Sequence, residues 1–176
     1  MTQVSKAARL ASLAHAGQFR KYSNSDQAYI CHPMRVAGQV SLVPNATNEM
    51  IAAAWLHDTI EDTEVDEGLL KKEFGPEVAK LVVEVTNPSR DFPSLKRFER
   101  KVIDREYLKS VSNEAKIIKL ADSIDNLTDL KNDPLVSEGF KKLYPSEIRQ
   151  LLNESLQGAE SSLELILDEK LKELNA

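Results

Sequence analysis

The stretch Ala52–Thr63, with the sequence AAAWLHDTIEDT, changes character in its middle. The run AAAWL is wholly apolar, and the residues after it bring together a histidine and three acidic side chains: His57, Asp58, Glu61 and Asp62. Side chains that carry charge are costly to bury without a partner. Because the segment from Glu49 to Ile60 is apolar nearly all round, we expect it to form a buried helix at the centre of the protein.

At helical spacing the four polar residues of this stretch form two neighbouring rows. His57 is paired with Glu61 and Asp58 with Asp62, each four residues apart. Carboxylates this close repel one another and raise each other's pKa values, and a bound divalent cation removes that repulsion. The simpler interpretation of an isolated His-Asp pair is a solvated helix end. The apolar run before it and the two acids after it favour a metal site instead.

The rest of the chain predicts an all-α fold. Helical periodicity recurs near Val4–Ala14, after Pro33, after Pro76, after Leu95 and after Ser112, and again from Ser146 to Leu174 with an interruption at Gly158. We find no alternating strand pattern and no internal repeat. A length of 176 residues suits one domain. We therefore expect a single-domain helical bundle over residues 1–176, with a motif-bearing core at about residues 7–131 and a C-terminal helical region at about 132–176.

The overall composition argues against several classes of partner. The formal net charge is −5, and no long run of Lys and Arg exists, so general binding to nucleic acid is not expected. No stretch approaches the roughly 20 apolar residues of a membrane span. Cys31 is the sole cysteine, which excludes an internal disulfide and fits a cytoplasmic location. The sequence does not indicate an oligomeric state.

Two further segments extend the metal hypothesis. YICHP places His32 just before an expected helix start, and KLADSIDNL places Asp122 on a late helix. On that helix Asp122, Asp125, Asn126 and Asp129 share one face. Taken alone, His32 suggests a hydrogen-bonded histidine and Asp122 a surface acid. The order H, then HD, then D resembles the ligand order of the HD metal-dependent phosphohydrolase superfamily.

The resemblance narrows to one branch of that superfamily. The segments HAGQFRK, YICHPMRVAG, AAAWLHDTIEDT, FGPEVAKLVVEVTN and AKIIKLADSIDNLTDL are similar to successive motifs of the hydrolase domain of RelA/SpoT proteins, whose stand-alone form is the small alarmone hydrolase family. The resemblance implies one Mn²⁺ per chain, held by His32, His57, Asp58 and Asp122. His15 is the single remaining histidine, so the chain cannot build a His-rich binuclear centre. We expect His15 to be a packed helix histidine.

The resemblance also implies roles for other residues. Glu61 and Asp62 match a catalytic acidic pair that handles water and protons beside the metal. Arg20 and Lys21 match a pair that contacts the base and sugar-phosphate region, and Asn126 matches a ribose-binding Asn. Further candidates for substrate binding are Arg97, Arg100 and Lys101 for the outer phosphates, and Tyr144 for stacking on the base. The alternatives for this last group are a solvated helix face and a buried structural tyrosine.

The implied reaction is hydrolysis of the 3′-pyrophosphate of guanosine tetra- or pentaphosphate to GDP or GTP and pyrophosphate. Two departures leave the nucleobase open: the loop from Lys21 to Tyr29 is longer than the family's, and Thr128 stands where the family often has Arg. Adenine alarmones and the phosphate of NADPH therefore remain candidate substrates. Two other functions are a 5′-nucleotidase or triphosphohydrolase of the wider HD group and a non-catalytic nucleotide-binding module. Glu61-Asp62 and Arg20-Lys21 together favour the alarmone hydrolase.

Overall fold

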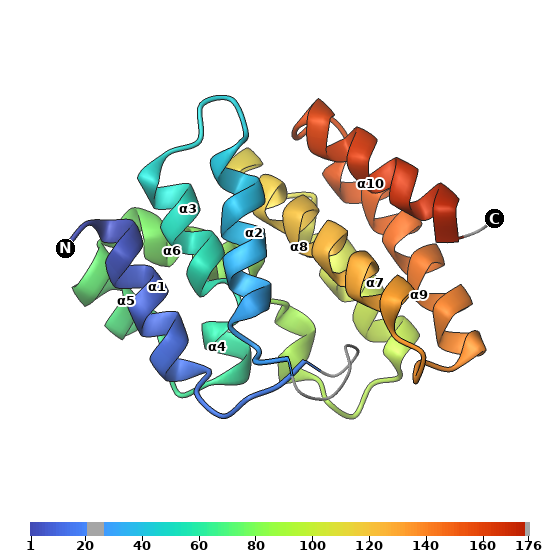
Figure 1. Ribbon diagram of the computed structural model, residues 1–176, viewed down its shortest axis with the longest axis horizontal. Helices are drawn as coiled ribbons and strands as arrows, with labels where there is room; N and C mark the ends of the chain where they lie inside the picture. Colours follow the sequence, from blue (N-terminus) through green and yellow to red (C-terminus); the bar gives the residue numbers. More distant parts are fainter. Residues whose placement is uncertain (21–26, 175–176) are drawn as a thin grey trace.

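The computed structural model describes residues 1–20 and 27–174, and they form a helical bundle (Figure 1). Among these residues there is no β-strand, only an isolated bridge between Phe19 and Ala28. The predicted all-α fold is confirmed. The helices in chain order are α1 (Gln3–Ala14), α2 (Cys31–Ser41), α3 (Asn48–Leu56), α4 (Thr59–Asp62), α5 (Glu67–Phe74), α6 (Pro76–Val85), the 3-10 helix η1 (Pro88–Asp91), α7 (Arg97–Leu108), α8 (Asn113–Asn132), α9 (Glu138–Leu151), the π-helical turn η2 (Leu152–Leu156) and α10 (Ser161–Leu174).

The long helix α8 organises the bundle. Helices α2, α3 and α6 pack against it from the N-terminal part of the chain, and α9 and α10 pack against it from the C-terminal part (Figure 1). Its apolar side chains, among them Leu120 and Leu127, are fully buried in one continuous core. No described helix is long and apolar enough to cross a membrane.

The expected helix from Glu49 to Ile60 is in fact two helices. Thr47 caps α3 by accepting a hydrogen bond from the backbone N–H of Met50 at 3.2 Å. Helix α3 ends at Leu56, and α4 begins only at Thr59. The prediction of one continuous helix was therefore wrong, and His57 and Asp58 occupy the turn between the two helices.

The C-terminal region also departs from expectation at its start. Helix α9 begins at Glu138 rather than at Ser146, because Ser137 caps it by accepting a hydrogen bond from the backbone N–H of Phe140. Pro145 lies inside this helix, although proline usually marks a first turn. The interruption at Gly158 is present: this glycine has a φ of +86°, a value that favours glycine over other residues.

Candidate functional site

His32 and His57 approach each other at the centre of the bundle. His32 lies in the first turn of α2 and His57 directly after α3, and their Nε2 atoms are 3.1 Å apart. The Nδ1 atom of His32 lies 2.6 Å from Oδ2 of Asp125, and that of His57 lies 2.8 Å from the carbonyl oxygen of Ala54. Each acceptor oxygen binds the proton on Nδ1 and so fixes the orientation of its imidazole ring. Both Nε2 atoms are then left facing the same point.

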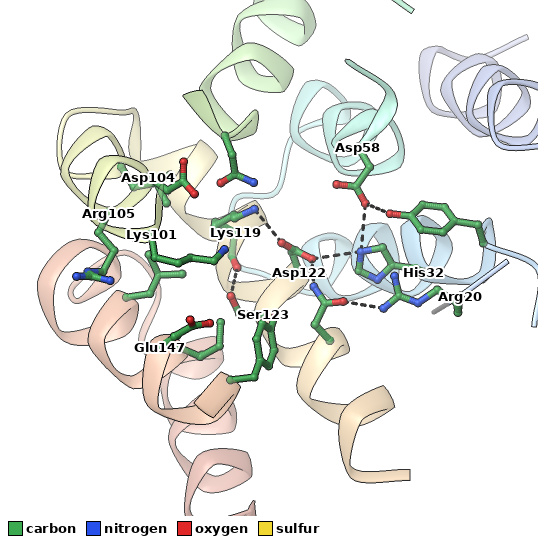
Figure 2. A pocket seen from close by; sticks show the side chains of 17 residues that line it. Arg20, His32, Asp58, Lys101, Asp104, Arg105, Lys119, Asp122, Ser123 and Glu147 are labelled. Atoms are coloured by element: carbon green, nitrogen blue, oxygen red, sulfur yellow. Dashed lines mark hydrogen bonds and ion pairs between the residues drawn. The ribbon is translucent and has the colours of Figure 1, made fainter. Parts of the chain in front are cut away.

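Two carboxylates complete this arrangement. Oδ2 of Asp58 lies 3.0 Å from Nε2 of His57, and Oδ1 of Asp122 lies 3.2 Å from Nε2 of His32. Figure 2 shows Asp58 from the turn between α3 and α4, His32 from α2 and Asp122 from α8 pointing toward one another. Two imidazole nitrogens with two carboxylate oxygens form a donor set that suits a borderline divalent cation such as Mn²⁺. His32, His57 and Asp58 have ligand atoms within 4.8 Å of one another, and Asp122 lies beside His32, so the residues present fit one metal ion.

The charges around these groups also favour a cation. Burial alone would raise the pKa of Asp122, but Lys119 and His32 hold it well below its usual range. Burial alone would lower the pKa of His32, but hydrogen bonds with Asp122, Asp125 and Asp58 raise it to about 10. The excess of negative charge thus retains a proton on His32, which a divalent cation would displace on binding.

Tyr29 connects this centre to its surroundings. Its hydroxyl donates to Oδ2 of Asp58 at 2.5 Å, and its ring lies 4.7 Å from that of His15 and 5.4 Å from the guanidinium of Arg20. His15 is buried as expected. Sequence reasoning did not single out Tyr29, although its place three residues before His32 was the available signal.

The expected acidic pair sits in two different environments. Oε1 of Glu61 accepts hydrogen bonds from the backbone N–H of Asn87 at 2.7 Å and from its Nδ2 at 3.0 Å. Burial raises the pKa of Glu61, although Lys119 and Asn87 oppose this. Asp62 is exposed, with its Oδ2 3.3 Å from the hydroxyl of Tyr29. The cavity beside the metal centre is lined by Asn87 and by neither member of the pair.

That cavity has a volume of about 200 Å³. Figure 2 shows its lining reaching from Arg20 and His32 at one end to Lys101 and Arg105 at the other. Lys119 stands between these ends, with its Nζ 3.0 Å from Oδ2 of Asp122. Burial, followed by repulsion from Lys119, lowers the pKa of Lys101.

The structure brings most of the predicted substrate-binding residues to this cavity, but not all of them. Arg20, Lys101, Asn126 and Tyr144 line it, whereas Arg100 does not. Arg97 forms an ion pair with Glu147 at 2.7 Å, and Lys21 lies outside the described residues. Sequence reasoning missed Lys119, Arg105 and Asn87. For Lys119 the signal was its position three residues before Asp122 on one helix.

Comparison with known proteins agrees with this geometry. The HD domain family matches residues 7–145. The chain belongs to the HD domain family. This HD domain is 37% identical over 161 residues to the guanosine-3′,5′-bis(diphosphate) 3′-pyrophosphohydrolase MESH1 of Drosophila melanogaster, with 90% of this chain and 87% of that protein covered. It is 34% identical to the human MESH1 protein, with 98% and 92% covered.

A solved structure extends the likeness to three dimensions. The HD domain superposes on the structure described as "A metazoan ortholog of SpoT hydrolyzes ppGpp and plays a role in starvation responses" with a TM-score of 0.87. The two are 30% identical in sequence, and the match covers 98% of this chain and 96% of the other. The resemblance to stand-alone RelA/SpoT-type hydrolases, inferred from the sequence motifs, is confirmed.

Proposed function

We propose that this protein hydrolyses the 3′-pyrophosphate of guanosine tetra- and pentaphosphate, giving GDP or GTP and pyrophosphate. One observation carries the proposal: the side chains of the four proposed metal ligands lie together at one end of a cavity that Arg20, Lys101 and Lys119 also line. A polyanionic nucleotide needs such cations at the walls. The MESH1 relatives, whose names state this activity, support the same substrate.

The proposed cofactor is one Mn²⁺ per chain, with His32, His57, Asp58 and Asp122 as its ligands. When bound, such an ion neutralises phosphate charge and makes a water molecule easier to deprotonate. Asp125 and the carbonyl oxygen of Ala54 hold the two imidazoles in the orientation that binding requires. We also propose a cytoplasmic location, which the sole cysteine supports.

The nucleotide would lie along the cavity. Arg20 and Asn126 share a hydrogen bond of 2.6 Å at the end nearest the metal ligands, where they would contact the ribose and base. Lys21, for which the same role is proposed, lies outside the described residues. Lys101, whose pKa is lowered by partial burial, lies toward the other end of the cavity, where it would hold the outer phosphates. Tyr144 offers a ring surface for stacking. Arg100 lies outside the lining, so it would reach only phosphates that extend beyond the cavity.

The acidic pair would handle the proton of the attacking water. Water attacks the phosphorus attached to O3′, the P–O3′ bond breaks, and O3′ leaves with a proton to become the free 3′-hydroxyl. Asn87 fixes the Glu61 carboxylate through two donors, and burial raises its pKa toward the value that suits a proton carrier. Asp62, linked to Tyr29, would orient the water or relay the proton to solvent.

A panel of nucleotides tests this function. The purified protein with Mn²⁺ is incubated with guanine and adenine 3′-diphosphates, NADPH and 5′-monophosphates, and the products are separated by anion exchange. We expect intact pyrophosphate from the 3′ position and unchanged 5′-phosphates. Orthophosphate from 5′-monophosphates, with no reaction of any 3′-diphosphate, would overturn the proposal in favour of a 5′-nucleotidase.

A further inference from the structure

Arg35 binds Asp125, the residue that orients His32. Its guanidinium donates two hydrogen bonds to Asp125, from Nε to Oδ1 at 2.5 Å and from Nη2 to Oδ2 at 2.8 Å. The same Oδ2 atom lies 2.6 Å from Nδ1 of His32. Arg35 follows His32 by three residues on α2, so both side chains face α8 from neighbouring positions on one helix face.

The same guanidinium reaches a second carboxylate. Nη2 of Arg35 donates to Oδ1 of Asp129 at 2.9 Å and to its Oδ2 at 3.0 Å. Oδ2 of Asp129 also accepts from Nε of Arg20 at 2.9 Å. Arg35 therefore stands between the partner of His32 and the partner of Arg20.

The hydrogen bonds continue from Arg20 back to the metal centre. Nη2 of Arg20 donates to Oδ1 of Asn126 at 2.6 Å, and Nδ2 of Asn126 donates to Oδ1 of Asp122 at 2.5 Å. That oxygen lies 3.2 Å from Nε2 of His32. The contacts thus close a circuit that starts and ends at His32 and includes two proposed metal ligands and two proposed nucleotide-binding residues.

We propose that Arg35 is a positioning residue that couples the metal ligand His32 to the nucleotide-binding residue Arg20. Arg35 itself does not line the cavity, and 30% of its side chain is exposed. It acts through Asp125 and Asp129, which are four residues apart on α8 and buried. This role rests on the proposed function, because it takes Arg20 as a nucleotide contact.

Charge explains why both carboxylates depend on Arg35. Like charges four residues apart on one helix repel each other, and burial weakens the screening by water. Burial alone would raise the pKa of Asp125, but hydrogen bonds from His32 and Arg35 hold it below its usual value. Without Arg35 the two carboxylates would separate, and Asp125 would loosen its hold on His32 while Asp129 would loosen its hold on Arg20.

Two variants of Arg35 and one matched control test the coupling. Arg35→Met keeps the aliphatic stem but removes the charge and the donors. Arg35→Lys keeps the charge but loses the two-pronged geometry. The control is Arg149→Met, because Arg149 is also an arginine, has 33% of its side chain exposed, and pairs with Asp168 away from the cavity. For each protein we would measure Mn²⁺ affinity by calorimetry without substrate, thermal stability of the metal-free form, and KM and kcat at saturating Mn²⁺.

We expect Arg35→Met to raise the Kd for Mn²⁺ by at least ~10-fold, the usual scale for loss of a group that orients a metal ligand. KM should rise several-fold at saturating Mn²⁺, with a smaller change in kcat. The Kd and KM of Arg35→Lys should lie between those of Arg35→Met and wild type. If Arg35→Met does not fold, the Kd and KM of Arg35→Lys test the proposal in its place. Arg149→Met should leave Kd and KM within a factor of about two of wild type. This change is smaller than the change expected for Arg35→Met, because Arg149 shares no partner with the metal ligands among the described residues.

The proposal is overturned if the Arg35 variants lose only thermal stability, as Arg149→Met would, while Kd and KM stay unchanged. It is also overturned if Kd rises without KM, because Arg35 would then serve His32 alone. Failure of the proposed function is a separate result: wild-type protein would then cleave no 3′-diphosphate, while the calorimetric arm would still report the effect of Arg35 on metal binding.

Discussion

The two acidic residues that follow the His-Asp pair are chemically similar, but they differ in exposure and in hydrogen-bond partners. Glu61 is half-buried and held by Asn87, whereas Asp62 is exposed and reaches Tyr29. Neither carboxylate lies within 4 Å of a His, Lys or Arg nitrogen among the described residues, in contrast to Asp58 beside His57. This separation from cationic side chains supports the proposed role of both carboxylates in handling the protons of water rather than in binding the metal.

Neutral isosteres of this pair separate catalysis from metal binding. Glu61→Gln and Asp62→Asn keep the shape of each side chain but remove its charge and most of its power to accept a proton. We expect each change to lower kcat by at least ~10²-fold, the usual scale for general acid–base help, while bound metal stays equal to that of wild type. Metal content and turnover would be measured together, with the exposed neighbour Glu64→Gln as control. Turnover at the wild-type rate would mean that the pair is merely structural.

Tyr29 provides a prediction about the surroundings of the metal. Tyr29→Phe removes the hydroxyl that donates to Asp58 at 2.5 Å and leaves the ring that packs on His15. Because groups that hydrogen-bond to a ligand orient it, we expect the Kd for Mn²⁺ to rise by about 10-fold. Calorimetry on the metal-free protein measures this. Tyr107→Phe, whose ring lies outside the cavity lining, should bind Mn²⁺ like wild type, and equal affinities in both variants would contradict the role of Tyr29.

At the scale of elements, the turn between α3 and α4 is the feature that builds the site. Ending α3 at Leu56 releases His57 and Asp58 from a regular helix, so both side chains point to the same centre. Helix α3 itself is short, its residues Met50, Ala52–Ala54 and Leu56 are buried, and its start depends on the Thr47 cap. The Thr47 hydroxyl therefore fixes where α3 begins, and packing in the core determines where it ends, just before the His-Asp pair.

Removing that cap should cost stability without touching the chemistry. Thr47→Ala leaves the backbone N–H of Met50 without its side-chain partner, and we expect the free energy of unfolding to fall by ~1 kcal/mol. Urea denaturation measures the change, and kcat at a temperature well below the transition should be unaffected. Thr47→Ser retains the hydroxyl and should stay near wild type. Equal losses in both variants would show that the methyl group, rather than the hydrogen bond, matters.

At the scale of the whole molecule, the proposed ligands come from three distant parts of the chain. His32 belongs to α2, His57 and Asp58 to the turn after α3, and Asp122 to α8. A metal ion at their meeting point would join these parts, and an ion that binds only the folded state stabilises it by mass action. Stability and metal occupancy should consequently rise and fall together.

Metal removal tests this link in the intact protein. We expect about one ion per chain by elemental analysis, because the ligands define a single site. Chelation should abolish turnover and lower Tm, and Mn²⁺ should restore both. His57→Ala and Asp58→Ala should have a low Tm that Mn²⁺ no longer raises. Full activity in chelator, with no metal detected, would rule out the proposed cofactor.

Several features of this protein follow from the sequence alone. Apolar periodicity predicted the all-α fold and a helix after Ser112, which is the helix that carries Asp122, and Gly158 was predicted to interrupt the C-terminal helical region. The motifs also indicated His32, His57 and Asp58, whose side chains the structure brings together. These inferences succeed because periodicity, caps and motif spacing are local properties, written within a few residues of the positions they describe.

Only the tertiary structure decided which residues form hydrogen bonds with the side chains of the site. The break after Leu56 and the early start of α9 departed from the local patterns, which favoured one continuous helix from Glu49 to Ile60 and a helix that begins only at Ser146. Asn87 meets Glu61 across 26 residues of sequence, and Asp125 meets His32 across 93. Such partners depend on how whole helices pack against α8. Packing sums many weak contacts between distant residues, and no local stretch of sequence carries that sum.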